Sequence, residues 1–360
     1  MTQRTRKILA QAGSFVLAGG LLYLALRGVD FSEVGTALRT AEYVWLLPLA
    51  LVTILSHLFR AWRWQVLLEA LPGETPRRVS LREAFGSLMI GYMVNYAAPR
   101  AGELARSAHL ARRTRQSFSG VLGTVAVERL LDVLVLGLAL VSVFFLLLDH
   151  LTTLDTLFFA PLRTRLGPGS VLVLGLGVLV VGGLVLLVYR RLVAGGHGGW
   201  AGRARTALRS FKAGLLTVLR SRRPGVILFS TLAMWFCYAL MAYLPFVLFG
   251  MNDAFGLTLV DAWNVMILGA IGVALPSPGG TGSYHYITIE TLVHLYGVAR
   301  SVAASYAIVA HAGQMVLYVM LGFAFLAFQG AGLRTLREVV REPEAPVTAP
   351  GPAESLRPPA

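Results

Sequence analysis

The 360-residue sequence is too apolar for a water-soluble domain. Hydrophobic residues make up 56% of it and charged residues only 14%, against about 25% charged in soluble proteins, and the mean hydropathy is +0.67. This composition predicts an all-α, polytopic integral membrane protein. The net charge of +14 does not indicate nucleic acid binding, because the basic residues gather at the ends of apolar segments. The single cysteine, Cys237, excludes an intrachain disulfide and a cysteine-based metal site, and we expect neither a metal nor a cofactor.

Six apolar segments are long enough to cross a hydrocarbon layer of about 30 Å as helices. The first follows a basic start and lacks a small-residue cleavage site, so we expect an uncleaved helix with a cytoplasmic N-terminus. Basic residues after the last segment predict a cytoplasmic C-terminus. We assign residues 1–333 to one domain in the cell (inner or plasma) membrane and 334–360 to a disordered, proline-rich tail. The predicted spans are 8–26, 43–68, 117–148, 170–189, 226–249 and 302–328.

Toward its end the second span carries basic and aromatic residues, among them Arg60, Trp62, Arg63 and Trp64. Such a girdle is typical of a membrane interface. We therefore expect Arg60 and Arg63 to be interfacial anchors whose stems lie along apolar surface, with contact to lipid headgroups as the alternative.

A polar, charged segment interrupts the apolar sequence between Asn95 and Arg106. A helix that begins near residue 84 has only about fifteen residues before Pro99. The proline ends this helix, which is then too short to cross the membrane. Because basic residues flank both ends, we expect a re-entrant hairpin from the cytoplasmic side, with residues 99–102 at its tip. Arg100, Glu103 and Arg106 recur at three-residue spacing on one face of the resuming helix. Together with Asn95 they indicate an anion-recognising site at membrane depth.

The third predicted span, 117–148, carries Glu128, Arg129 and Asp132 near its middle. Glu128 and Asp132 are one turn apart on the same helical face, with Arg129 beside them. One interpretation is a structural cluster of ions that compensate one another. We favour the other, in which these charges are coupled to those of the hairpin.

A second break follows the apolar segment 263–275, where two prolines and three glycines lie between Pro276 and Gly282. A helix restarting near Ser283 would offer its first-turn amides to an anion, and no Gly-Lys-Ser/Thr follows to make a Walker-type loop. We expect a second re-entrant hairpin, entering from outside. The candidate binding residues here and in the last span, where His311, Gln314 and Tyr318 share a face, are Ser277, Gly279, Gly280, Gly282, Tyr284, Glu290, His311 and Gln314.

The order of elements predicts an inverted repeat, although we detect no repeat at the level of residues. The first half consists of a span, a hairpin entering from inside and another span. The second half consists of a span, a hairpin entering from outside and another span. Paired broken segments of this kind indicate a transporter's binding site at the middle of the membrane. Separately, the basic segment 190–223 has apolar residues at helical spacing, which predicts an amphipathic helix on an anionic leaflet. The sequence predicts no oligomeric state.

Three motifs in this order resemble the lysylphosphatidylglycerol synthase transmembrane region family, also called flippase-like proteins. They are Asn95 to Arg106, Glu128-Arg129-Leu-Leu-Asp132 and Pro276 to Gly282, and the resemblance covers about residues 8–330. It implies a membrane region that moves an aminoacylated phospholipid between leaflets, while a separate soluble domain makes that lipid. Only about thirty residues follow Phe328. We therefore expect no aminoacyl transfer by this chain.

Three classes of function remain open. We favour a lipid translocator or scramblase that recognises an anionic or aminoacylated phospholipid, or a lipid-linked headgroup, at the charged site. The first alternative is a membrane-embedded enzyme or accessory subunit acting on lipid-linked substrates. Its candidate acid and base groups are Glu103, Glu128, Asp132, Glu290, His109, His285 and His294, but no catalytic motif spacing is present. The second alternative is a partner or regulator that transports nothing.

Overall fold

The computed structural model describes residues 3–70, 78–98, 101–148, 221, 223–274 and 277–328. All regular structure within these ranges is helical, as expected from the composition. Four helices in the described ranges are long and apolar enough to cross a membrane. They are α3 (Leu46–Glu69), which continues the short 3-10 helix η1 (Tyr43–Trp45), α6 (Phe118–Leu146), α11 (Pro224–Leu248) and α15 (Arg300–Phe328).

A fifth span is possible at the start of the chain. Helix α1 (Gln3–Leu26) is followed by α2 (Phe31–Thr40), and the two meet at 83°. Asp30 begins α2 by accepting a hydrogen bond from the Ser32 amide at 2.8 Å. The predicted span 170–189 and nearly all of the basic segment 190–223 lie outside the described residues.

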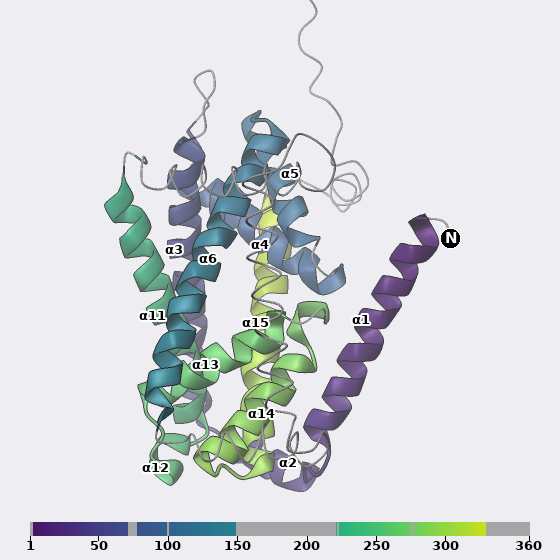
Figure 1. Cartoon of the computed structure of the whole chain (residues 1–360), viewed down its shortest axis with the longest axis vertical. Coiled ribbons are helices and arrows are strands. Elements are labelled where there is room, and N and C mark those ends of the chain that lie inside the picture. Colours follow the sequence, from purple (N-terminus) through teal and green to yellow (C-terminus); the bar gives the residue numbers. More distant parts are fainter. Residues whose placement is uncertain are drawn as a thin grey trace, which may run out of the picture.

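Two pairs of shorter helices occupy the positions of the predicted hairpins. The first hairpin is α4 (Leu81–Ala97) and α5 (Gly102–Thr114). The second hairpin is α13 (Leu259–Ala274), the 3-10 turn η4 (Pro278–Gly280) and α14 (Ser283–Tyr296). The first lies toward one end of the bundle, together with the end of α3, and the second toward the other end, together with α2 and the short α12 (Met251–Phe255) (Figure 1).

The helix boundaries follow from local sequence. Helix α4 begins at a capping box in which Ser80 and Glu83 each bond the backbone of the other, and it ends at Ala97, shortly before Pro99. Helix α14 begins at the predicted Ser283, directly after Gly282, whose φ is +84°. A side chain at Gly282 would also collide with the backbone oxygen of Ala18 in α1, 2.2 Å from an added Cβ. The second hairpin therefore packs closely on α1.

Both hairpins close through the same kind of contact. In the first, a Cβ added at Gly91 of α4 would lie 2.8 Å from the carbonyl oxygen of Gly102, the first residue of α5. In the second, a Cβ added at Gly272 of α13 would lie 2.7 Å from the carbonyl oxygen of Ser283, the first residue of α14. The glycine precedes its partner by eleven residues in each case. Only a residue without a side chain permits this approach.

A side chain also fastens each closure. Asn95 Oδ1 accepts a hydrogen bond at 2.7 Å from the amide of Gly102, which caps α5 from the opposite helix. In the second hairpin the Ser283 hydroxyl donates to the Gly272 carbonyl at 2.7 Å and lies 2.8 Å from the Ser277 hydroxyl. Helix α15 then joins the two hairpins, because it packs against both α4 and α14.

Candidate functional site

The charges of α3 and α6 face each other inside the bundle. Arg60 donates from Nε to Glu128 Oε1 at 2.7 Å, and its Nη2 also contacts Asp132. Arg63 donates to Asp132 Oδ1 at 2.6 Å. Arg60 and Arg63 are one turn apart on α3, as Glu128 and Asp132 are on α6, so the two helices present matching pairs.

The expectation that Arg60 and Arg63 are interfacial anchors is wrong. Arg63 is 0% exposed and Arg60 is buried as well. Arg60 lies nine residues before the end of α3, about 13 Å along the helix axis, which is too deep for an interfacial position. Both arginines are held by the carboxylates of α6, because burying a guanidinium requires an opposite charge.

Arg106 of α5 links the first hairpin to this ion network. Its Nη1 donates to Glu128 Oε2 at 3.1 Å, and its guanidinium lies 4.8 Å from the ring centre of Trp64. The Trp64 ring is itself fixed by a hydrogen bond from Nε1 to the Thr124 hydroxyl at 2.9 Å. Glu128 therefore contacts three arginines, two from α3 and one from α5, while it is 0% exposed.

Arg129 is held differently from the other three arginines. It lies 3.6 Å from Glu103 and 3.7 Å from Asp132, beyond hydrogen-bond distance, and its side chain is 41% exposed. Its Nε atom is buried without a hydrogen-bond partner among the described residues. Arg129 is thus a loosely held cation beside a tightly bonded network.

We call these seven side chains the charged cluster: Arg60, Arg63, Arg106, Arg129, Glu103, Glu128 and Asp132. Four cations and three anions leave one positive charge in excess within the described part of the chain. Two further guanidinium nitrogens, Arg63 Nε and Arg106 Nη2, are buried without a hydrogen-bond partner among the residues that the structure describes. This part of the structure therefore has a surplus of cationic hydrogen-bond donors.

The tips of the two hairpins meet in a second cluster, formed by Tyr96, Gly279, Tyr284, His285 and His311. Tyr96, near the end of α4, covers Gly279 so closely that an added Cβ would lie 2.6 Å from its ring. His311 Nε2 lies 2.9 Å from the Gly279 carbonyl oxygen. The His311 ring stacks on Tyr284 at 5.5 Å and meets His285 edge-on at 4.8 Å. We call this group the tip cluster.

A cavity of about 590 Å³ lies between the charged cluster and the tip cluster. This volume is within the usual range for small-molecule sites. Its wall draws on α3, both hairpins, α6, α11 and α15. The predicted site residues that line it are Asn95, Glu103, Arg129, Asp132, Ser277, Gly279, Gly280, Tyr284, His311 and Gln314.

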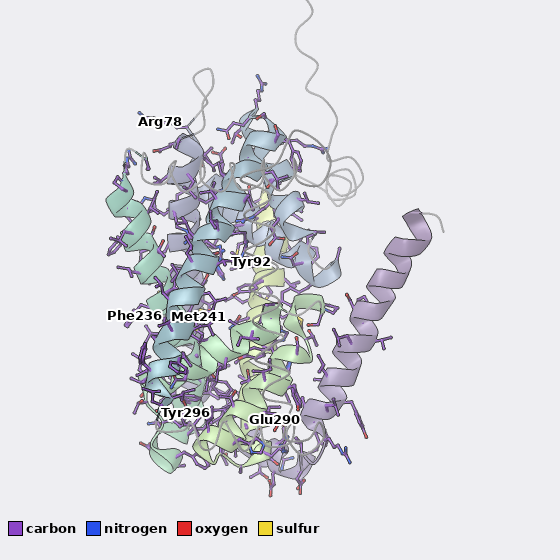
Figure 2. The ribbon with its side chains drawn as sticks, viewed as in Figure 1. Arg78, Tyr92, Phe236, Met241, Glu290 and Tyr296 are labelled. Carbon is purple, nitrogen blue, oxygen red and sulfur yellow. The ribbon has the colours of Figure 1, made fainter. Side chains whose placement is uncertain are left out.

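The other predicted site residues lie elsewhere. Arg106 and Glu128 are buried in the ion network, and Gly282 packs on α1. Glu290 pairs with Arg300 at 2.8 Å, and its Oε2 lies 2.8 Å from His294 Nε2. Figure 2 shows it near the end of the molecule where α2 lies, whereas Tyr92, which lines the cavity, is nearer the middle. Arg100 lies outside the described residues, and an anion at the first-turn amides of α14 stays a prediction.

Sequence reasoning placed Tyr318 on a face with His311 and Gln314 but missed the other aromatic residues of the cavity wall, His57, Tyr92 and Tyr238. His57 Nε2 lies 2.8 Å from the Tyr318 hydroxyl, and the Tyr318 ring stacks on Tyr92 at 5.0 Å. Tyr238, on α11, accepts a hydrogen bond from Arg60 at 3.0 Å. Sequence reasoning also missed that Arg60 and Arg63 are partners of α6, for which the available signal was their spacing of about one turn, three residues, beside the four-residue spacing of Glu128 and Asp132. Within the described ranges, no group of three or more histidine, cysteine or acidic side chains is arranged to hold a metal ion.

The comparisons with known proteins concern nearly the whole membrane region. A family model described as the lysylphosphatidylglycerol synthase TM region matches residues 11–322. Comparison with curated proteins and with solved structures returned no significant match.

Proposed function

We propose that this chain, which belongs to the lysylphosphatidylglycerol synthase TM region family, moves an anionic phospholipid between the leaflets of a membrane by passing its headgroup through the cavity. Family membership places it among membrane proteins related to lipid handling. The observation that carries the finer proposal is the position of Arg129. It lines the cavity, makes no hydrogen bond to a described residue and belongs to a cluster with excess positive charge.

A lipid phosphate has a physical reason to bind there. When an anion takes the place of Glu103 or Asp132 beside Arg129, the arginine loses a carboxylate contact and gains another charge-assisted contact. The headgroup then leaves water without losing all of its electrostatic stabilisation. Arg60, Arg63 and Arg106 keep their own partners throughout, so the exchange does not unfold the bundle.

The acyl chains would stay outside the protein, along α6. Val133 borders the cavity and is nevertheless 64% exposed. Further along the same helix, Leu138 and Phe145 are also exposed apolar side chains. Such a surface suits hydrocarbon, so a lipid can place its headgroup in the cavity while its tails remain in the bilayer.

We further propose that the hairpins are re-entrant and form an inverted repeat. The shared closure, glycine against the first residue of the returning helix eleven residues later, supports a repeat that the sequence alone did not reveal. Arg82, Arg113 and Arg115 flank the first hairpin, whereas Asp253 and Asp261 precede or begin the second. By the positive-inside rule, we place the end with the first hairpin and both termini in the cytoplasm, and we propose the cell membrane as the location.

Labelling of introduced cysteines tests this topology. In a Cys237→Ala background, Arg113→Cys, in the last turn of the first hairpin, and Ala254→Cys, before the second, are both at exposed positions. We expect an impermeant thiol reagent to reach them from opposite faces of the membrane. The unsubstituted Cys237→Ala protein is the control for background labelling. Labelling of both cysteines from one face would rule out the inverted repeat.

Reconstitution in liposomes tests the function itself. We expect the purified protein to move labelled phosphatidylglycerol between leaflets while mass spectrometry finds its headgroup unchanged. A changed headgroup mass would instead identify an enzyme acting on lipid substrates. If the lipid neither moves nor changes, the translocator proposal is wrong, and an accessory role is the remaining interpretation.

A further inference from the structure

We infer that a small recess between α4, α5 and α6 is a binding site for a single halide ion such as chloride. The recess adjoins the main cavity and has a volume of about 10 Å³, close to that of one water-sized sphere. It has room for a monatomic ion but not for a tetrahedral phosphate. The inference therefore concerns a site separate from the path of a lipid headgroup, and it holds whether or not the chain moves lipid.

Two arginine nitrogens at the recess lack an acceptor in the part of the chain that the structure describes. Arg106 is 2% exposed, and its Nη1 donates to Glu128, but its Nη2 is buried without a hydrogen-bond partner. The Nε of Arg129 is buried in the same way, although the rest of that side chain is partly exposed. Burying a charged donor without an acceptor is unfavourable. Because both arginines line a recess of single-ligand size, one acceptor bound there can contact both.

The balance of donors and charges at the recess favours an anion over a water molecule as this acceptor. Asn95 Oδ1 is occupied by the Gly102 amide at 2.7 Å, so its amino group is the part left for a ligand. A water molecule must place two protons of its own, whereas a halide only accepts hydrogen bonds. Two arginines and one carboxylate, that of Glu103, belong to the described lining. A bound halide would neutralise the positive charge in excess in the charged cluster.

Glu103 does not block such an ion. Its carboxylate lies 3.6 Å from Arg129 Nη2, not from the Nε atom that lacks an acceptor, and its side chain is 33% exposed. Solvent therefore screens its repulsion of a neighbouring anion. A route to the recess exists as well, because Tyr92, Asn95, Glu103 and Arg129 line both the recess and the main cavity.

Thermal unfolding of the purified protein in detergent, without added lipid, tests the inference. The melting temperature Tm is measured in sodium chloride, sodium bromide and sodium gluconate, mixed at constant ionic strength. Gluconate is too large for the recess. We expect each halide to raise Tm by about 2 °C over gluconate and the rise to saturate, as it does for a ligand that binds only the folded state. Equal Tm in all three salts, or a rise without saturation, would overturn the inference.

Variants of Arg129 locate the ion. Arg129→Gln should abolish the halide-dependent rise in Tm, and Arg129→Lys should reduce it, because lysine keeps the charge but has no donor at the position of Nε. Arg113→Gln is the matched control, since Arg113 is a partly exposed arginine that does not line the recess, and it should keep the full rise. A full rise in Arg129→Gln would place the ion elsewhere and contradict the inference.

Asn95→Asp tests the same site by supplying the negative charge from the chain. Aspartate keeps an oxygen to accept from the Gly102 amide and places its second oxygen where the amino group of Asn95 lies. We expect this variant to have the same Tm in gluconate as the wild type has in chloride, and to gain nothing from halide. A variant that still gains stability from chloride would contradict the inference. Should Asn95→Asp fail to fold, the Arg129 variants decide the question.

Discussion

Replacing Glu128 by glutamine is expected to destabilise the folded protein by about 3–5 kcal/mol, the usual cost of removing one partner from a buried ion pair. Glu128 is fully buried and lies within 4 Å of Arg60, Arg63 and Arg106. Without its charge, Arg60 and Arg63 would keep only Asp132 as a carboxylate partner among the described residues. Arg106 would lose its only ion pair there.

A thermal unfolding scan in detergent measures this loss. Glu103→Gln is the matched control, because Glu103 is partly exposed and its contact with Arg129, at 3.6 Å, is longer than a hydrogen bond. We expect it to cost no more than about 1 kcal/mol. The double variant Glu128→Gln/Arg106→Gln should recover part of the stability, since it removes a cation together with its acceptor. If Glu128→Gln unfolds at the wild-type temperature, Glu128 is not a structural centre of the bundle.

Replacing Arg129 by glutamine should have the opposite profile, a large loss of transport with little loss of stability. A hydrogen bond to a charged group is worth about 1.5–3 kcal/mol, so headgroup binding should weaken roughly tenfold to a hundredfold. The contacts that Arg129 makes to Glu103 and Asp132 are long and partly exposed, and they contribute at most about 1 kcal/mol to folding. Arg129→Lys should restore transport in part, since it keeps the charge without the planar donor group.

The sequence predicts where the helices break but not how the breaks are closed. Pro99 and the run from Pro276 to Gly282 are local signals, since proline and glycine limit backbone conformation whatever surrounds them. The helices therefore end and restart where expected, at Ala97 and Ser283. The close approach of Gly91 to Gly102 is a tertiary contact. A glycine in a helical pattern does not by itself indicate its partner.

The charged site was predicted only in part, because some of its residues have a local signal and the others are identified only by tertiary contacts. Glu128 and Asp132 stand out because they lie in the middle of an apolar span, so a functional or structural partner had to exist. Arg60 and Arg63 lie nearer the end of theirs and have an ordinary interfacial explanation. Only the packing of α3 beside α6 shows that they are the partners. The roles of Arg106 and Arg129, one buried and one loosely held, likewise depend on neighbours from other helices.

The most direct test of headgroup passage through the cavity is the rate at which labelled phosphatidylglycerol changes leaflets in liposomes. The rate is compared for the wild type, Arg129→Gln and Arg113→Gln. Arg113 has nearly the same exposure as Arg129, 42%, and pairs with Glu83 at 3.4 Å, but it does not line the cavity. We expect Arg129→Gln to lose at least tenfold in rate and Arg113→Gln to match the wild type. A folded Arg129→Gln protein that moves the lipid at the wild-type rate would contradict a headgroup site in this cavity.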